Sequence, residues 1–323
     1  FLGSINQYNE PRTYRIPTGA LRAGRNLLFI RVQDDGGGGG LADAPGRFYV
    51  QTQAGRIDLK GVAKFKIAAE KKVTSAANIQ NQPATLYNAM IAPLLPLSIR
   101  GAIWYQGESN AAMAYEYRRL FPAMIQDWRN RWGQGDFPFY FVQLSSYGAL
   151  RTEPGESNWA ELREAQTMTL QMPHTGMAVT IDVGNPNNIH PVQKKEVGDR
   201  LALAALNHTY DLKSLEYAGP QLESWKVEGN KMLLTFSHAE GGLQVKGATA
   251  KHFAIAGEDK KFVWANASVK DNTITLSHPS VAKPVAIRYA WADSPVEANV
   301  FNKAGLPAVP FRTDNWKGIT QTD

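Results

Sequence analysis

The feature of this sequence that most limits its possible folds is an alternation of apolar runs and helix-like segments in the middle of the chain. Three short apolar runs predict buried strands, and they lie at residues 98–105, 137–144 and 177–183. Apolar residues at spacings of three and four predict a helix after each run, at residues 117–132, 158–172 and 194–206. Strands that alternate with helices form parallel sheets covered by those helices. We therefore expect an α/β core.

The segments on either side of this core lack a helical period and favour β-structure. Before the core, short runs rich in β-forming residues are separated by turn residues, and the glycine run Gly36–Gly40 predicts a loop. After the core, short strand-like runs recur at hairpin intervals, with turn signals such as Glu228–Asn230. We predict three regions: a β-sandwich or jelly roll at 1–74, the α/β core at 75–212 and a β-rich region at 213–323.

Composition excludes several classes of protein. The formal net charge is +6, but lysine and arginine are mixed with acidic residues, so nucleic acid is not an expected partner. No apolar stretch approaches the roughly eighteen residues that a spanning helix needs, so we expect no membrane span. The absence of cysteine excludes disulfides, thiolate metal sites and a cysteine nucleophile. The six histidines show no paired metal spacing, and we expect neither a metal nor another cofactor.

Polar residues collect directly after each predicted strand. Residues 106–110 follow the first strand, 143–146 the second and 182–191 the third. In an open α/β sheet, ligands bind beyond the carboxyl ends of the strands. We therefore expect the three loops to line a common crevice, with Gln143 and Asn188 as candidate residues of its rim.

His190 is the most informative single residue at this edge. It follows a loop rich in glycine, asparagine and proline and precedes a predicted helix, where a side chain can project into a crevice. Two interpretations are open at this point. The residue is either a catalytic base or a histidine that only caps the following helix, which is the commoner case.

The run Gly107–Asn110 also has two interpretations. It can form a tight turn whose backbone N–H groups and amides stabilise an oxyanion. It can equally be a glycine turn in which Asn110 caps the next helix. Ser109 is an alternative nucleophile, although the G-x-S-x-G nucleophile elbow is absent because Asn110 and Ala111 follow it.

Longer stretches of the chain resemble the sialate O-acetylesterases, a family within the SGNH (GDSL-like) hydrolases. The run Gly101–Asn110 is similar to the central motif of that family. Further matching runs are Leu120–Pro122, Asp136–Phe139, Gln143–Leu144, Arg163–Gln166, Asn188–Pro191, Lys194–Gly198 and Arg200–Ala202. Upstream, Tyr8–Arg12, Ile30–Val32 and the glycine run resemble the family's inserted galactose-binding-like β domain. Downstream, Gly305–Ala308 and Pro310–Trp316 resemble its C-terminal signature.

The resemblance implies a flavodoxin-like α/β hydrolase without a bound cofactor. In such an enzyme a serine attacks the acetyl carbonyl, a histidine takes the serine proton, and hydrogen-bond donors hold the oxyanion. The resemblance makes His190 the base, and it puts Gln106, Gly107, Glu108 and Asn110 in the loop beside the oxyanion. It implies O-acetylated sialic acid or another acetylated glycan as substrate, and a periplasmic or secreted bacterial location.

Two departures from the family pattern change these expectations. The family's nucleophile lies in a Gly-Gln-Ser-Asn motif that this sequence lacks. The sequence also has no initiator methionine, so we expect a piece of a longer gene product, or a second chain that carries the N-terminal part and the serine. The aspartate that usually precedes the histidine is replaced by amides at residues 185, 187 and 188. Asp182 is the nearest acid, and it could orient His190 only if the loop folds back.

Two other functions stay open. The protein could be an acetyl esterase that acts on xylan or other polysaccharides, because loops determine the choice of sugar. It could also be a non-catalytic glycan-binding protein with a degenerate hydrolase core. The missing serine and the amide-rich loop before His190 both fit that second alternative.

Overall fold

The structure is a computed structural model of the chain, and it describes residues 1–4, 12–32, 48–59, 64, 66–67 and 82–322. The chain divides into two compact units, Phe1–Ala76 and Ala77–Asp323. Residue 212, where we predicted a boundary between the core and the β-rich region, falls inside the second unit. Both regions therefore belong to one compact body.

The first unit contains a β-hairpin. Strands β1 (Tyr49–Thr52) and β2 (Gly55–Asp58) pair antiparallel, with Tyr49 opposite Asp58. Within the described residues of this unit these are the only regular strands, so the galactose-binding-like sandwich stays a prediction. The glycine run lies outside the described residues.

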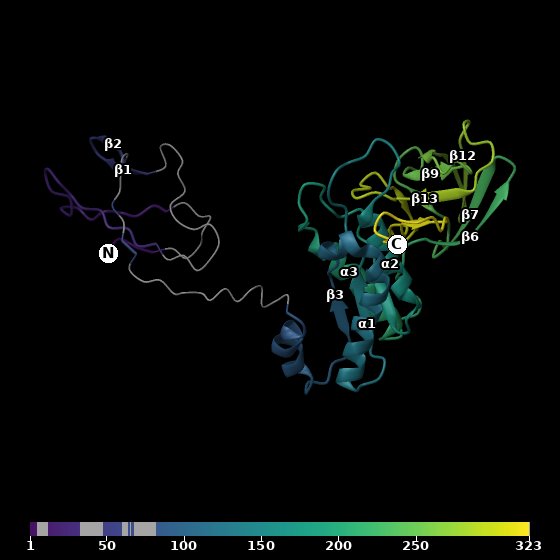
Figure 1. The fold of residues 1–323 in the computed structure, drawn as a ribbon, viewed down its shortest axis with the longest axis horizontal. Coiled ribbons are helices and arrows are strands. Elements are labelled where there is room, and N and C mark those ends of the chain that lie inside the picture. The colour runs from purple at the N-terminus through teal and green to yellow at the C-terminus, as the bar shows by residue number, and fades with distance from the viewer. Residues whose placement is uncertain (5–11, 33–47, 60–63, 65, 68–81, 323) are drawn as a thin grey trace. The chain divides into compact units, whose positions relative to one another are not determined.

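The second unit opens with the predicted α/β core (Figure 1). Its regular elements are β3 (Ala102–Trp104), α1 (Ala114–Trp132), β4 (Phe139–Val142), α2 (Asn158–Met168), β5 (Thr175–Ala178) and α3 (Lys194–His208). Shorter helical turns are a π-helix, Tyr87–Ile91, and 3-10 turns at Ala92–Leu94, Glu108–Met113 and Thr169–Gln171. The strands are parallel in the order β3-β4-β5, which confirms the predicted parallel sheet with flanking helices.

The central strand β4 explains how the helices are placed. All four of its side chains are buried, and successive side chains of a strand point to opposite faces of the sheet. Phe139 and Phe141 pack into a cluster with Phe121 of α1 and Leu162 of α2, whereas the other two pack with α3. α1 and α2 therefore cover one face and α3 covers the other. A strand buried on both faces has a continuous apolar sequence without alternation, so its short length, rather than a period of two, indicated a strand.

The helix ends follow ordinary capping chemistry. Ser157 caps α2, and its Oγ accepts a hydrogen bond from the Ala160 amide at 2.9 Å. α1 ends at Gly133, which has the left-handed φ of +65° that glycine adopts without strain. The first cap marks where the loop after β4 ends, and the second marks where α1 turns back toward β4.

The β-rich region consists of antiparallel strands. One sheet has the order β11-β12-β7-β6, a second has the order β10-β9-β13-β15, and β14 pairs with β8. The strands are β6 (Gln221–Glu228), β7 (Lys231–Ser237), β8 (Gln244–Val245), β9 (Phe253–Ala256), β10 (Val263–Trp264), β11 (Asn266–Lys270), β12 (Thr273–Ser277), β13 (Ala286–Tyr289), β14 (Val300–Phe301) and β15 (Phe311–Arg312). The predicted β-rich C-terminal region is thus confirmed.

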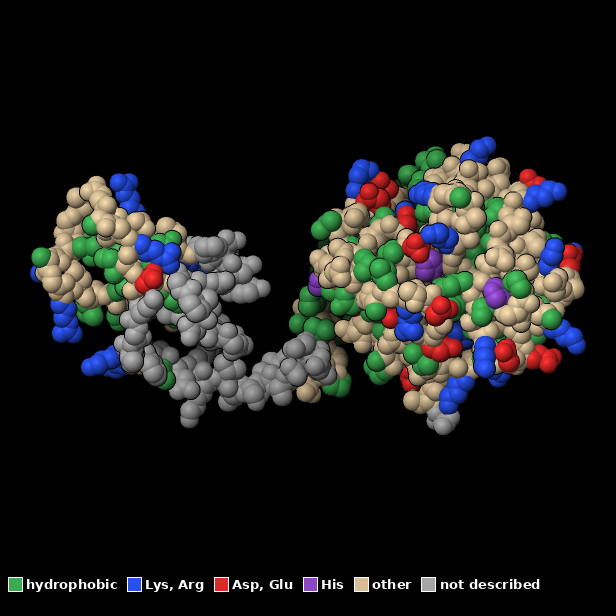
Figure 2. Space-filling view, turned by 90° about the horizontal axis from the view of Figure 1, so that it is seen from above, with side chains coloured by type: hydrophobic (Ala, Val, Ile, Leu, Met, Phe, Trp, Pro, Cys, Tyr) green, Lys and Arg blue, Asp and Glu red, His purple; other side chains and the backbone are tan. Residues whose placement is uncertain are grey.

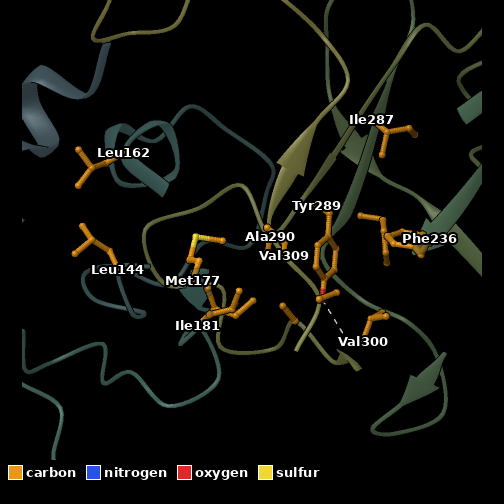
Figure 3. Packing of buried hydrophobic residues seen from close by; sticks show 14 of the residues in the cluster. Leu144, Leu162, Met177, Ile181, Phe236, Ile287, Tyr289, Ala290, Val300 and Val309 are labelled. Carbon is orange, nitrogen blue, oxygen red and sulfur yellow. Dashed lines mark hydrogen bonds between the residues drawn. The ribbon is translucent and has the colours of Figure 1, made fainter. Parts of the chain in front are cut away.

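One continuous hydrophobic cluster joins this region to the core. Figure 3 shows Leu144 and Leu162 from the core in the same cluster as Phe236 and Tyr289 from the two large antiparallel sheets. Tyr289 is fully buried, and its hydroxyl accepts a hydrogen bond from the Val300 amide at 3.4 Å. The β-rich region is therefore packed onto the α/β core rather than tethered to it.

The surface is mixed in charge. On the face of the second unit drawn in Figure 2, basic and acidic side chains lie interspersed. Across the ranges that the structure describes, no helix is both long enough and apolar enough to cross a membrane.

Candidate active site

The parallel sheet brings three polar loops to one edge. Because β3, β4 and β5 run in the same direction, the loops after residues 104, 142 and 178 all start at the same edge of the sheet. The loops after β4 and β5 are joined directly, since Ser146 Oγ donates to the Ile181 carbonyl at 2.6 Å and Thr180 Oγ1 donates to the Gln143 carbonyl at 2.6 Å. Buried hydrogen bonds thus fix the loops after β4 and β5 to one another.

Gln106 is the centre of the first loop. Its Nε2 donates to Asn110 Oδ1 at 2.8 Å, and its Oε1 accepts from the Tyr117 hydroxyl at 3.1 Å. Burial raises the pKa of Tyr117 to about 12, so the hydroxyl keeps its proton and stays a donor. Gln106 and Asn110, two of the predicted loop residues, are therefore held together by α1. Tyr117 was not predicted as a site residue, because an aromatic residue at helical spacing has the pattern of a core residue.

No residue with a side chain fits at the position of Gly107. Its φ is +152°, which side-chain-bearing residues rarely adopt, and a Cβ there would lie 2.9 Å from Leu162 Cδ2 and 3.2 Å from Gln166 Nε2. The loop therefore lies directly against α2. The 3-10 turn Glu108–Met113 begins at the next residue.

Tyr105 links the first loop to the other two. Burial raises the pKa of Tyr105. The hydrogen bond of its hydroxyl with Ser145 lowers this pKa, and the nearby Glu108 raises it. The Lys194 ammonium, at the start of α3, lies 4.6 Å from the centre of the Tyr105 ring. Glu108, predicted in this loop, is thus a charge close to the point where the three loops meet.

The structure leaves the His190 imidazole exposed at this edge. The His190 amide donates to Asn188 Oδ1 at 2.9 Å, and the Asn187 amide donates to Asn185 Oδ1 at 2.9 Å. The amide side chains of the loop therefore stabilise its own backbone turns. Within residues 82–322 no hydrogen bond joins the imidazole to a neighbouring side chain, and none joins it to the exposed Ser109.

Asp182 does not orient His190 in this structure. Its two carboxylate oxygens accept hydrogen bonds from the Arg200 guanidinium, at 2.7 Å each, and both side chains are largely buried. Arg200 also donates to the Val179 carbonyl at 2.6 Å. A bidentate pair of this kind fixes the orientation of the carboxylate toward Arg200. Our expectation that the loop could fold back onto Asp182 is corrected by this pairing.

Gln143 also differs from its predicted place on the rim. The side chain is fully buried, and its Nε2 donates to Thr167 Oγ1 at 2.9 Å and to the Arg163 carbonyl at 3.2 Å. It therefore points into the space between β4 and α2. The sequence could not distinguish the two directions, because the residue follows the last residue of a strand that is buried on both faces. Among the described residues, no group of histidine or acidic side chains is arranged to hold a metal ion.

Comparisons with known proteins define the class and then the family. Residues 71–207, which include the whole sheet edge, match the family model described as "Carbohydrate esterase, sialic acid-specific acetylesterase". A solved structure of a carbohydrate acetylesterase from Xanthomonas citri superposes with a TM-score of 0.68 at 45% identity, covering 72% of this chain and 54% of that one. The α/β unit thus matches a class of carbohydrate esterases in both sequence and fold.

The curated relatives narrow this assignment. The sialate O-acetylesterase of Mus musculus is 34% identical over 76% of this chain and 49% of its own length. The Homo sapiens protein of the same name is 34% identical over 71% of this chain and 48% of its own length. The chain belongs to the sialate O-acetylesterase family. It spans about half the length of these relatives, and nothing in the comparisons supports our expectation of a separate chain that carries the N-terminal part.

Proposed function

We propose that this protein removes acetyl groups from O-acetylated sugars, sialic acids foremost, with His190 as the general base. The observation that carries the proposal is the shared sheet edge: the loop of amide and backbone donors after β3 and the exposed histidine after β5 both follow strands that end at that edge. Family membership supplies the reaction class, an ester hydrolysis. In this proposal the loop after β3 provides the donors and His190 provides the base.

The reaction proceeds in two halves. A serine Oγ attacks the acetyl carbonyl carbon while His190 accepts the serine proton, and the tetrahedral oxyanion is stabilised by the loop that contains Gln106, Gly107 and Asn110. The sugar oxygen then leaves and takes the proton from His190. Water, deprotonated by His190, releases acetate from the acetyl-serine and regenerates the serine.

The serine of this proposal lies outside the given sequence. Three observations support this arrangement. The family's Gly-Gln-Ser-Asn motif is absent, and the chain spans about half the length of its relatives. In addition, the Ile103 side chain of β3 is 71% exposed. It lies on the face of the sheet where α3 covers the two neighbouring strands, β4 and β5. Because α3 covers β4 and β5 but leaves this apolar side chain exposed, a segment outside the given sequence can pack against β3.

The test is an assay of the protein with its N-terminal part restored. O-acetylated sialic acid and an acetylated xylan fragment are compared as substrates for wild-type protein, His190→Ala and His278→Ala. His278 is a half-buried histidine of the β-rich region, and its Nδ1 lies 2.7 Å from Ser280 Oγ. Its replacement controls for the loss of a histidine side chain away from the sheet edge. We expect His190→Ala to lower kcat by about 10²- to 10⁴-fold and His278→Ala to leave it unchanged.

The outcomes separate the alternatives. Faster turnover of xylan than of sialic acid would favour the polysaccharide esterase, and absence of turnover in the restored wild-type protein would favour a glycan-binding protein. Full activity of His190→Ala would refute the assignment of the base. A periplasmic or secreted location is part of the same proposal and is tested by fractionating cells that express the restored protein.

A further inference from the structure

Helix α2 carries an unusual set of buried polar side chains. Arg163 and Gln166 are both fully buried, and they belong to the run Arg163–Gln166, one of the runs that resemble the esterase family. A buried polar group destabilises a protein unless it is hydrogen-bonded. The partners of these two side chains therefore indicate what the run does.

Gln166 spans the ends of two strands. Its Nε2 donates to the Val142 carbonyl at 3.2 Å, at the last residue of β4, and to the Gln106 carbonyl at 3.3 Å, just after β3. Its Oε1 accepts from the Leu144 amide at 2.9 Å. One amide side chain thus joins the backbones of two neighbouring strands where their hydrogen-bonded ladder has ended.

The same side chain restricts the loop that begins at Gly107. A Cβ on Gly107 would lie 3.2 Å from Gln166 Nε2, so the loop passes against the amide with no side chain between them. Gln106 is held from the other side by the Tyr117 hydroxyl. The direction in which the loop leaves β3 is therefore set by α1 and α2 together.

Arg163 performs the equivalent task for the loop after β4. It donates to the carbonyls of Leu144 at 2.7 Å and Ser145 at 2.9 Å, and to those of Ala292 at 2.7 Å and Asp293 at 2.9 Å in the β-rich region. The loop after β4 is thereby fixed to both halves of the second unit. The loop after β4 is thus held by Arg163 as well as by Gln166. Within residues 82–322 the loop after β3 has no hydrogen bond to Arg163, so it depends on Gln166 alone for its hydrogen-bonded attachment to α2.

We propose that Gln166 is a positioning residue of the esterase: it sets the spacing between the loops after β3 and β4, so that the Gln106–Asn110 loop presents its donors to the oxyanion. This inference rests on the proposed function. Gln166 is buried and reaches no substrate, so its loss lowers kcat through misplaced donors while KM changes little.

The geometry suggests a substitution with a distinctive pH signature. In Gln166→Glu, an ionised carboxylate can only accept hydrogen bonds, and two carbonyl oxygens would face it without a donor. The protonated carboxyl group provides one donor and one acceptor, which restores part of the native pattern. Burial beside carbonyls favours the protonated form. The ratio of Gln166→Glu to wild-type kcat should therefore rise as pH falls, and taking the ratio cancels any pH dependence that the two proteins share.

Two further variants serve as controls. Gln166→Met keeps the length of the side chain but offers no hydrogen bonds, so its kcat should fall by about 10- to 100-fold at every pH. Thr169→Val removes a buried hydrogen bond of α2, from Thr169 Oγ1 to the Ala165 carbonyl at 3.0 Å, without touching either loop. It should leave kcat unchanged, although it weakens the fold.

Amide hydrogen exchange on the same proteins gives a result that does not depend on activity. In Gln166→Met the Leu144 amide should lose protection, whereas the Gln143 amide, bonded to the Ala178 carbonyl at 2.9 Å, should keep it. Unchanged protection at Leu144 would overturn the proposal even if the wild-type protein proved inactive. Wild-type activity with a pH-independent kcat ratio for Gln166→Glu, or with undiminished kcat in Gln166→Met, would overturn it as well.

Discussion

Replacing Gly107 with alanine tests how closely the first loop is held against α2. The native backbone has φ of +152°, and an added Cβ would stand 2.9 Å from Leu162 Cδ2, far inside a normal carbon–carbon contact. Leu162 is fully buried and has no free space to move into. The substitution therefore combines backbone strain with overpacking at one position.

The expected loss follows from these two effects. A residue held in a sparsely populated backbone region costs about 1–3 kcal/mol, and overpacking a close-packed core costs about 1–3 kcal/mol. The free energy of unfolding of the second unit should fall by about 2–6 kcal/mol. Gly133→Ala is the matched control. Its φ is +65° and nothing lies within 4 Å of the added Cβ, so only the left-handed backbone contributes, about 1–2 kcal/mol.

Urea unfolding followed by tryptophan fluorescence measures this difference. All eight tryptophans lie between residues 104 and 316, so the signal reports on the second unit alone. The midpoint of Gly107→Ala should lie well below that of Gly133→Ala, with similar slopes. Equal midpoints would refute the reasoning, because they would mean that the loop can move away from Leu162.

Two further predictions concern charge. Asp182→Asn removes one of the two oxygens that pair with Arg200, so the free energy of unfolding should fall by roughly 3 kcal/mol, while the pH profile of turnover in the restored protein stays the same. Lost turnover with unchanged stability would instead mean that Asp182 acts on His190. Burial, with smaller contributions from Lys213 and His238, lowers the pKa of His208, whose ring lies 4.2 Å from that of Tyr217. Protonation then favours the unfolded state, so stability should be full above the ordinary histidine pKa and decline as pH falls below it. Urea midpoints measured from pH 8 to 5 should show a flatter decline for His208→Gln, and an identical decline would contradict this cause.

The sequence alone determined the α/β class and the edge at which polar residues gather. Both follow from local periodicity, because the burial of a strand or helix face is written in residues that are neighbours along the chain. The strand around residues 139–142 and the loop Gln106–Asn110 were found in this way. The resemblance also gave the family, since its motifs extend over long stretches.

Only the tertiary structure decided the partners of the polar side chains. Asp182 pairs with Arg200 rather than His190, Gln143 turns inward, and Gln166 spans two strands. Each contact joins residues that are distant along the chain, and Arg163 binds the Ala292 carbonyl across 129 positions. A hydrogen bond depends on the direction and distance of approach of two backbones. Local periodicity carries neither quantity, so the sequence located the edge of the sheet and the fold determined how its loops are held.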